Sequence, residues 1–95
     1  MYVIISRHPA AIEFIRANDA RFLAAPVITG NATPDDVRGK VVAGNIPLSL
    51  AALAEEVVAV EFSGAPPRGV EYSAADMDAA GARLERYTVR WARWA

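Results

Sequence analysis

Short β-branched apolar runs recur along this chain and alternate with segments that have helical patterning. Met1–Ser6, Lys40–Gly44 and Val57–Ser63 are each short enough to be a fully buried strand. Buried strands that alternate with helices form mostly parallel sheets, because the helices cover the faces of the sheet. We therefore predict one α/β domain over residues 1–95, Rossmann-like, with a mostly parallel sheet and helices on both faces.

The segments between these runs complete the predicted order. Pro9–Asn18 is predicted to be a helix, since proline is favoured at the first helical position. Arg21–Thr29 holds a second apolar run that Pro26 interrupts, which predicts an edge strand or a broken one. The remaining predicted elements are a helix over residues 48–56, a helix from the N-cap Ser73 to about Arg86, and a last strand over Tyr87–Trp91. A helical continuation is the alternative for the last of these, because arginines also recur there at helical spacing.

Composition limits the classes of protein to which the chain can belong. Its 95 residues form one small domain that buries only part of its surface, so we expect a homodimer. The net charge of -1 disfavours binding to long nucleic acid, which usually needs a basic surplus. The sequence has neither a secretory signal nor an apolar stretch of membrane-spanning length, and the expected location is the cytoplasm.

No metal ion or cofactor is predicted. The chain has no cysteine and one histidine, which excludes thiolate metal sites and a cysteine nucleophile. Asp35 and Asp36 lie in a turn-rich loop without a nearby histidine or glutamate at ligand spacing, so a solvated loop with a short capped turn is the favoured interpretation. The glycine-rich motifs that cradle dinucleotides or nucleoside triphosphates are absent.

The run Ser6-Arg7-His8-Pro9 follows the first predicted strand and contains the only histidine. Ligands of open α/β folds bind at the carboxyl ends of the strands, where a helix N-terminus offers free backbone N–H groups to an anion. Arg7 can form a two-pronged hydrogen bond with a phosphate, and His8 can transfer a proton near neutral pH. These residues predict a phosphate-containing ligand. The alternative is that they only cap and solvate the start of a helix.

Gly44-Asn45-Ile46-Pro47 follows the third predicted strand and would reach the same edge of a parallel sheet. If the two strands are neighbours, Gly44 lets a ligand approach the backbone, and Asn45 offers a donor and an acceptor to a base or a ribose. A tight turn is the alternative role of Gly44. The coincidence of two such loops at one edge favours the ligand hypothesis more than either loop alone.

Three other groups are weaker candidates. Arg68 could reach a phosphate while Glu71 orients it, although a surface ion pair is the commoner outcome. Trp91 and Trp94 could stack on bases, but a tryptophan near a terminus more often packs in a core or a dimer interface. Glu55-Glu56 is predicted to be the solvated end of a helix.

Several strings of the sequence occur in the order of one known family: Ser6-Arg7-His8-Pro9-Ala10, Val41–Gly44 leading into Ile46-Pro47, Leu50-Ala51-Ala52, Pro67-Arg68-Gly69-Val70-Glu71 and Gly81-Ala82-Arg83-Leu84-Glu85. They resemble a small CRISPR-associated family found beside type III systems, similar to the ring nucleases with a CARF-like Rossmann fold. The SRHP start and the RG-x-E string are the most specific parts. The family usually carries threonine where this chain has Asn45.

The resemblance implies a ligand and an activity. The ligand would be cyclic tetra-adenylate, the second messenger made by the type III effector, and its cleavage would switch off the messenger-activated effectors. A ribose 2′-hydroxyl would attack the neighbouring phosphate without a metal ion, while Arg7 or Arg68 neutralises the added charge. His8 would act as acid, base or hydrogen-bond donor, and Ser6 with the amides from Pro9 onward would hold a neighbouring phosphate. The symmetric ring suits a homodimer.

Two other functions fit the same sequence. The same residues could bind or sequester the cyclic oligonucleotide without cutting it. The chain could also be a structural partner that docks on a larger effector through the end that contains Trp91 and Trp94.

Overall fold

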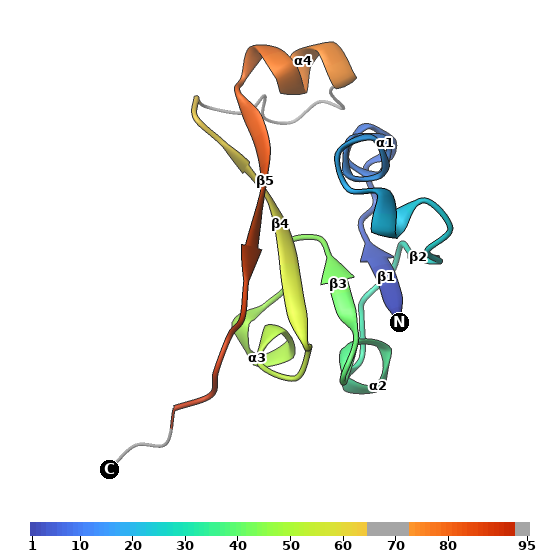
Figure 1. The fold of residues 1–95 in the computed structure, drawn as a ribbon, viewed down its shortest axis with the longest axis vertical. Coiled ribbons are helices and arrows are strands. Elements are labelled where there is room, and N and C mark those ends of the chain that lie inside the picture. Colours follow the sequence, from blue (N-terminus) through green and yellow to red (C-terminus); the bar gives the residue numbers. More distant parts are fainter. Residues whose placement is uncertain (65–72, 93–95) are drawn as a thin grey trace.

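The computed structural model describes residues 1–64 and 73–92 of the chain. Five strands form one sheet in the order β2-β1-β3-β4-β5, in which the first four are parallel and β5 is antiparallel to β4 (Figure 1). The strands are β1 (Tyr2–Ile5), β2 (Val27–Ile28), β3 (Val41–Ala43), β4 (Glu56–Phe62) and β5 (Ala82–Tyr87). The prediction of an α/β fold with a mostly parallel sheet is confirmed.

Short helices pack on the two faces of the sheet and make two separate cores. The helices are α1 (Pro9–Asn18), the 3₁₀ turn η1 (Ala20–Phe22), α2 (Pro34–Val37), α3 (Leu48–Ala51) and α4 (Ala74–Ala79). Ile4 of β1 packs with Ile15, Phe22 and Met77, which come from α1, η1 and α4. The preceding residue, Val3, packs on the opposite face with side chains from α2 and α3. Successive strand residues thus alternate between the cores, as in strands buried on both sides.

Several predicted elements are confirmed. The first helix spans Pro9–Asn18, as expected from the proline at its first position. The run interrupted by Pro26 forms β2, two residues at the edge of the sheet. The turn-rich loop leads into the four-residue helix α2. Thr33 and Asp36 form a capping box at the start of this helix. Ser73 caps α4 in the same way. Among the described helices, none has the length and apolar character needed to cross a membrane.

The helix predicted over residues 48–56 is too long. It ends at Ala51, and Glu56 is instead the first residue of β4, where it pairs with Val41 of β3. The prediction that Glu56 lies at the solvated end of a helix is therefore wrong. Its side chain is only 15% exposed, because it lies between two arginines from other elements.

The prediction for the C-terminal part of the chain is also wrong. The helix that begins after Ser73 ends at Ala79, and Gly81 follows with a φ of 73°. The chain then reverses into β5, and residues 88–92 have no regular structure, so neither the strand predicted over Tyr87–Trp91 nor its helical alternative occurs. Pairing with β4 overrides the helical propensity of Ala82–Tyr87. A side chain at position 81 would also lie 2.9 Å from the Cβ atom of Ser63.

Candidate functional site

A cleft of about 630 Å³ lies at the carboxyl ends of β1 and β3. The chain leaves β1 for β2 on one side and then returns to the other side of β1 for β3, so the strand order reverses between these two strands. Ligands of open α/β sheets bind at this kind of reversal. The volume lies within the range of roughly 300–1,000 Å³ that is usual for small-molecule sites.

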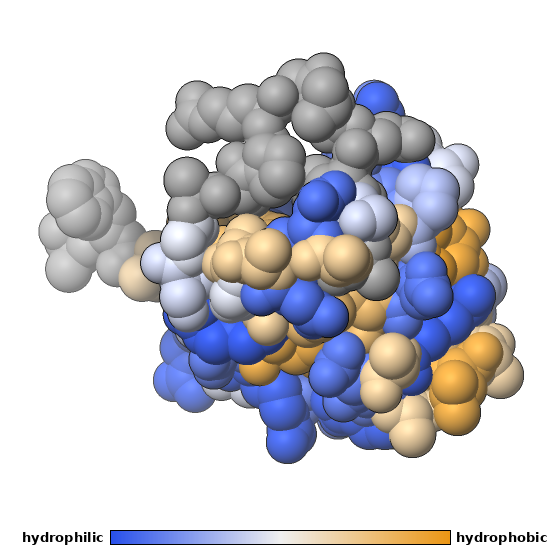
Figure 2. All heavy atoms as spheres, turned by 90° about the horizontal axis from the view of Figure 1, so that it is seen from above, coloured by the Kyte–Doolittle hydropathy of each residue, from blue (hydrophilic) through white to orange (hydrophobic). Residues whose placement is uncertain are grey.

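Three loops line the cleft. They are residues 5–8 after β1, residues 29–32 after β2 and residues 44–47 after β3, with Ala11, Ile15, Leu50, Val60 and Phe62 forming the apolar wall. Figure 2 views the molecule from the end toward which the parallel strands point, and it shows hydrophobic residues exposed among hydrophilic ones. The lining of the cleft therefore combines apolar side chains with the polar side chains of its loops.

The structure brings together most of the predicted site residues but not all of them. Ser6, Arg7, His8, Gly44 and Asn45 all line this cleft, which agrees with the expectation that two strand-end loops share one edge of the sheet. Pro9 does not line it and contacts a second hollow on the outer side of α1.

The other proposed residues cannot be placed at the cleft. Arg68 and Glu71 lie outside the described residues, and so does Trp94. Trp91 is 71% exposed and does not line the cleft.

Arg7 is the cation of the cleft, and neutral groups orient it. Its Nε donates a hydrogen bond to the Thr29 carbonyl at 3.0 Å, and its Nη2 makes a longer contact of 3.5 Å with Oδ1 of Asn31. Among the described residues, no carboxylate forms an ion pair with Arg7. The guanidinium is thus held in place while its positive charge is not neutralised.

His8 occupies the N-cap position of α1, with φ of -99° and ψ of 113°. Its backbone N–H donates to the Ser6 hydroxyl at 3.2 Å, and its carbonyl accepts from Ile12 at 3.1 Å. Ser6 and His8 therefore do shape the start of the helix, as one interpretation of the sequence expected. The exposed His8 side chain and the Ser6 hydroxyl proton can still serve a ligand.

Gly44 brings β3 close to β1. It has a φ of 139°, and a Cβ atom there would lie 2.1 Å from the carbonyl oxygen of Ile5. No other residue type fits without moving the β1 backbone. The tight approach of two strands therefore explains this glycine, independently of any ligand.

The side-chain amide of Asn45 bridges to β4. Its Nδ2 donates to the Val60 carbonyl at 3.2 Å, and its Oδ1 accepts from the Val60 N–H at 3.1 Å. The side-chain N–H and oxygen that we expected to bind a ligand therefore both hydrogen-bond to the backbone of Val60, which also lines the cleft.

The cleft contains no acidic side chain among the described residues that line it. Its titratable groups are Arg7 and His8, so the local charge favours an anionic ligand. In the described part of the chain, no three potential metal-ligating side chains gather at one place.

Sequence reasoning missed the loop of residues 29–32, which supplies the partners of Arg7. The signal was available in principle. This loop follows the parallel strand β2, and so it emerges at the same edge as the other two loops.

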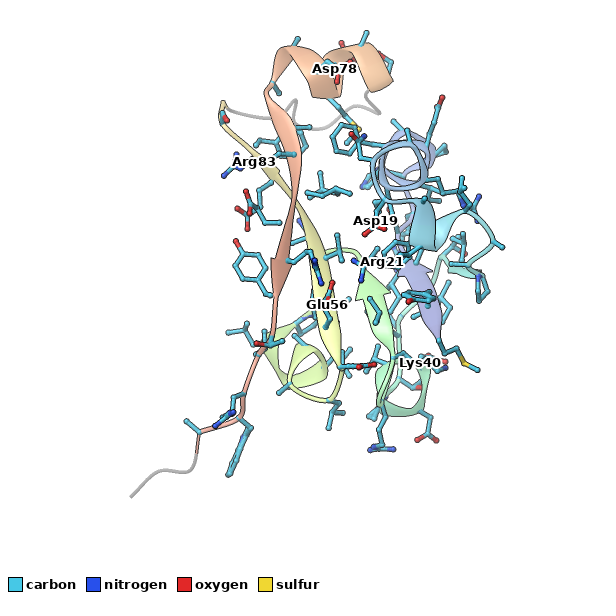
Figure 3. All side chains as sticks on the ribbon, in the orientation of Figure 1. Asp19, Arg21, Lys40, Glu56, Asp78 and Arg83 are labelled. Carbon is cyan, nitrogen blue, oxygen red and sulfur yellow. The ribbon has the colours of Figure 1, made fainter. Side chains whose placement is uncertain are left out.

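A second group of charges lies at the opposite end of the sheet. Arg21 of η1 contacts Asp19 at 2.7 Å and Glu56 at 2.9 Å (Figure 3). Arg86 of β5 contacts Glu56 at 2.9 Å. Hydrogen bonds from Arg86 and then Arg21 lower the pKa of Glu56 to about 2. The hydrogen bond from Arg21 likewise lowers the pKa of Asp19. These carboxylates are therefore charged at any physiological pH.

The comparison with known protein families gives one match. A family model described as "Putative CRISPR-associated protein (Cas_VVA1548)" matches residues 3–90, a range that contains every residue lining the cleft. Neither the curated proteins nor the solved structures yield a significant match.

Proposed function

The chain belongs to this family of CRISPR-associated proteins, and from that premise we propose that it is a ring nuclease that binds and cleaves cyclic tetra-adenylate. The observation that carries the proposal is the cation of the cleft. Arg7 is oriented by neutral groups and faces a cavity in which no described residue is acidic. The planar fork of a guanidinium matches the oxygens of a phosphate and can bind it with two parallel hydrogen bonds.

The fold supports the same proposal. The cleft lies at the reversal of strand order, where nucleotide ligands bind in Rossmann-like folds. We propose that the domain is of the CARF-like type. The apolar wall, which includes Phe62 and Leu50, provides surface against which an adenine base can pack.

The size of the cleft supports a homodimer. A volume of about 630 Å³ suits part of a ring of four nucleotides better than the whole ring. A ring with two-fold symmetry is complementary to two identical clefts related by a two-fold axis. We propose that each subunit binds one half of the ring.

The reaction that we propose uses a nucleophile within the substrate. A ribose 2′-oxygen forms a bond to the adjacent phosphorus, the bond from phosphorus to the 5′-oxygen breaks, and a 2′,3′-cyclic phosphate end results. The proton of the 2′-hydroxyl leaves, and a proton is added to the departing 5′-oxygen. The protein has to align the attacking oxygen and stabilise the added negative charge.

We propose a distinct role for each residue at the start of α1. Arg7 stabilises the charge on the phosphorane, and His8 transfers a proton or donates a hydrogen bond. Ser6 and the backbone amides that follow Pro9 hold a neighbouring phosphate, because the first N–H groups of a helix have no partner within it.

A binding module that does not cut the ring is the second candidate. One observation favours it: His8 is the only imidazole of the chain, and no described residue lining the cleft offers a carboxyl group as a second proton carrier. Cleavage moves two protons, whereas binding needs only groups that position the ring and stabilise its charge.

Product analysis tests the proposal directly. The purified protein is incubated with cyclic tri-, tetra- and hexa-adenylate, with and without EDTA, and the products are separated by chromatography. We expect cyclic tetra-adenylate to become linear products with 2′,3′-cyclic phosphate ends, with EDTA having no effect. Binding without products would favour the second candidate. Loss of cleavage in EDTA and its recovery with a divalent ion would overturn the mechanism.

A further inference from the structure

The parallel neighbours β3 and β4 differ in length, and of the two only β4 lines the cleft, through Val60 and Phe62. β3 has three residues and β4 has seven, and they pair from Val41–Glu56 to Ala43–Val58. One further bond, from the Gly44 N–H to the Val58 carbonyl at 2.9 Å, closes this ladder. Beyond that point β4 continues along the cleft without a strand on its β3 side.

Val60 is the next residue of β4 whose backbone polar groups turn toward β3, since alternate residues of a strand present these groups to the same side. Val60 is buried, with 8% of its surface exposed, so an unbonded N–H and C=O there would destabilise the fold. The side-chain amide of Asn45 bonds to both. An amide carries the same donor and acceptor as a peptide group, and it therefore extends the ladder by one rung after the main chain has left the sheet.

The same contact fixes the loop of residues 44–47. Gly44 lies so close to the Ile5 carbonyl of β1 that there is no room for a side chain, and Asn45 hydrogen-bonds to β4 on the other side. This loop, which lines the cleft together with Arg7, is thus packed against β1 on one side and hydrogen-bonded to β4 on the other.

We infer that Asn45 is a positioning residue of this site, which fixes the loop of residues 44–47 relative to Arg7, and that it is not a main contact of the ligand. The expected effect of Asn45 on catalysis rests on the proposed function. The hydrogen bonds between Asn45 and Val60 do not depend on it. An error of about 1 Å in such an arrangement can cost on the order of 100-fold in rate.

The test compares Asn45→Ala with Asn18→Ala. Asn18 also donates a hydrogen bond from its side-chain amide to a backbone carbonyl, that of Phe14 at 2.9 Å, but it lies at the end of α1 and does not line the cleft. Three quantities are measured: hydrogen exchange of the Val60 amide without ligand, kcat on cyclic tetra-adenylate, and Kd for the ring made of deoxyadenylates, which lacks the attacking 2′-hydroxyls.

For Asn45→Ala we expect Val60 amide exchange to accelerate at least about 10-fold, since its acceptor is removed. We expect kcat to fall about 10- to 100-fold while Kd for the deoxy ring changes less than about 3-fold. Asn18→Ala should change none of the three. Asn45→Gln, whose longer side chain keeps the amide but misplaces it, should recover little of kcat.

Two results would overturn the inference. A Kd weakened 10-fold or more with unchanged Val60 exchange would make Asn45 a ligand contact, and faster exchange with an unchanged kcat would make it a structural residue only. Failure of the proposed function gives a different pattern. In that case the parent protein does not cleave the ring, while the exchange of the Val60 amide still reports whether Asn45 anchors the loop.

Discussion

The two ends of the sheet use arginine in opposite ways. At the amino end of the parallel strands, Arg21 and Arg86 share Glu56, and Arg21 also binds Asp19. At the carboxyl end, Arg7 is held by a carbonyl and a side-chain amide, and among the described residues it has no carboxylate partner. The first arrangement uses charge to join η1, β4 and β5, whereas the second leaves a positive charge available.

This difference separates charge that is used within the fold from charge that is available to a ligand. An arginine between two carboxylates has little affinity left for a phosphate. An arginine held by neutral partners keeps both its orientation and its charge. The comparison predicts that substitutions at the amino end affect stability, whereas the substitution of Arg7 affects activity.

The largest effect is expected from Arg7→Ala. Removal of one preorganised donor to a developing negative charge typically costs on the order of 100-fold or more in rate. We expect turnover of cyclic tetra-adenylate to fall by that factor, more than the affinity for the ring, with no large change in Tm. Steady-state kinetics and thermal unfolding measure the two effects. His8→Ala should reduce turnover comparably if His8 transfers a proton, and less if it only positions the ribose.

An Arg7→Ala variant that folds and cleaves at the parent rate would remove this corner from the active site. The capping role of Ser6 and His8 at the start of α1 would then be the better account of the motif.

The next largest effect is expected from Glu56→Gln, and it concerns stability. The substitution replaces a carboxylate that accepts hydrogen bonds from two arginines at 2.9 Å. Because the site is mostly buried, we expect a loss of about 1–2 kcal/mol in the free energy of unfolding. Urea denaturation measures it, and turnover per folded molecule should stay at the parent value. A drop in turnover without a loss of stability would contradict the separation of the two regions.

A related loss of stability is expected at low pH. The pKa of Glu56 is about 2 in the folded protein, below its ordinary value of 4.5, and that of Asp19 is also lowered. Their stabilising contribution is therefore complete above about pH 4.5 and is lost progressively as the pH falls through about 2. We expect urea midpoints to decline over this window. In Glu56→Gln the decline should be shallower, and an equally steep decline would show that other carboxylates cause it.

The smallest effect is expected from Arg38→Ala. Arg38 pairs with Asp35 at 2.7 Å, but the two side chains are 59% and 91% exposed. Exposed pairs of this kind contribute under about 0.5 kcal/mol, because water and salt screen them. Both stability and turnover should stay close to the parent values. Arg38→Ala is thus the matched control for Arg7→Ala, and a large effect of either kind would show that loss of an arginine alone perturbs the protein.

Local signals predicted part of this molecule well. The proline at the start of α1 and the apolar run of β1 act within a few residues, and both elements occur where they were expected. The parallel sheet predicts that the β1 and β3 loops share one edge, and the five residues singled out in these two loops all line the same cleft.

The errors come from contacts between residues far apart in the sequence. Ala82–Tyr87 has helical propensity, and only its pairing with β4 makes it a strand. The bond between Asn45 and Val60 depends on β3 being shorter than β4, which no local pattern reveals. Likewise, the sequence predicts a solvated Glu56 because its partners, Arg21 and Arg86, lie 35 and 30 positions away from it in the chain.

The central claim is that the anionic ring binds at the carboxyl end of the sheet, and amide chemical shifts test it most directly. The labelled protein is titrated with cyclic tetra-deoxyadenylate, which lacks the 2′-hydroxyls needed for the proposed cleavage. We predict that the shifts concentrate in residues 5–8, 29–32 and 44–47, and that Arg7→Ala weakens them. Shifts confined to the region of Arg21, Glu56 and Arg86, or no shifts at saturating ligand, would contradict the account.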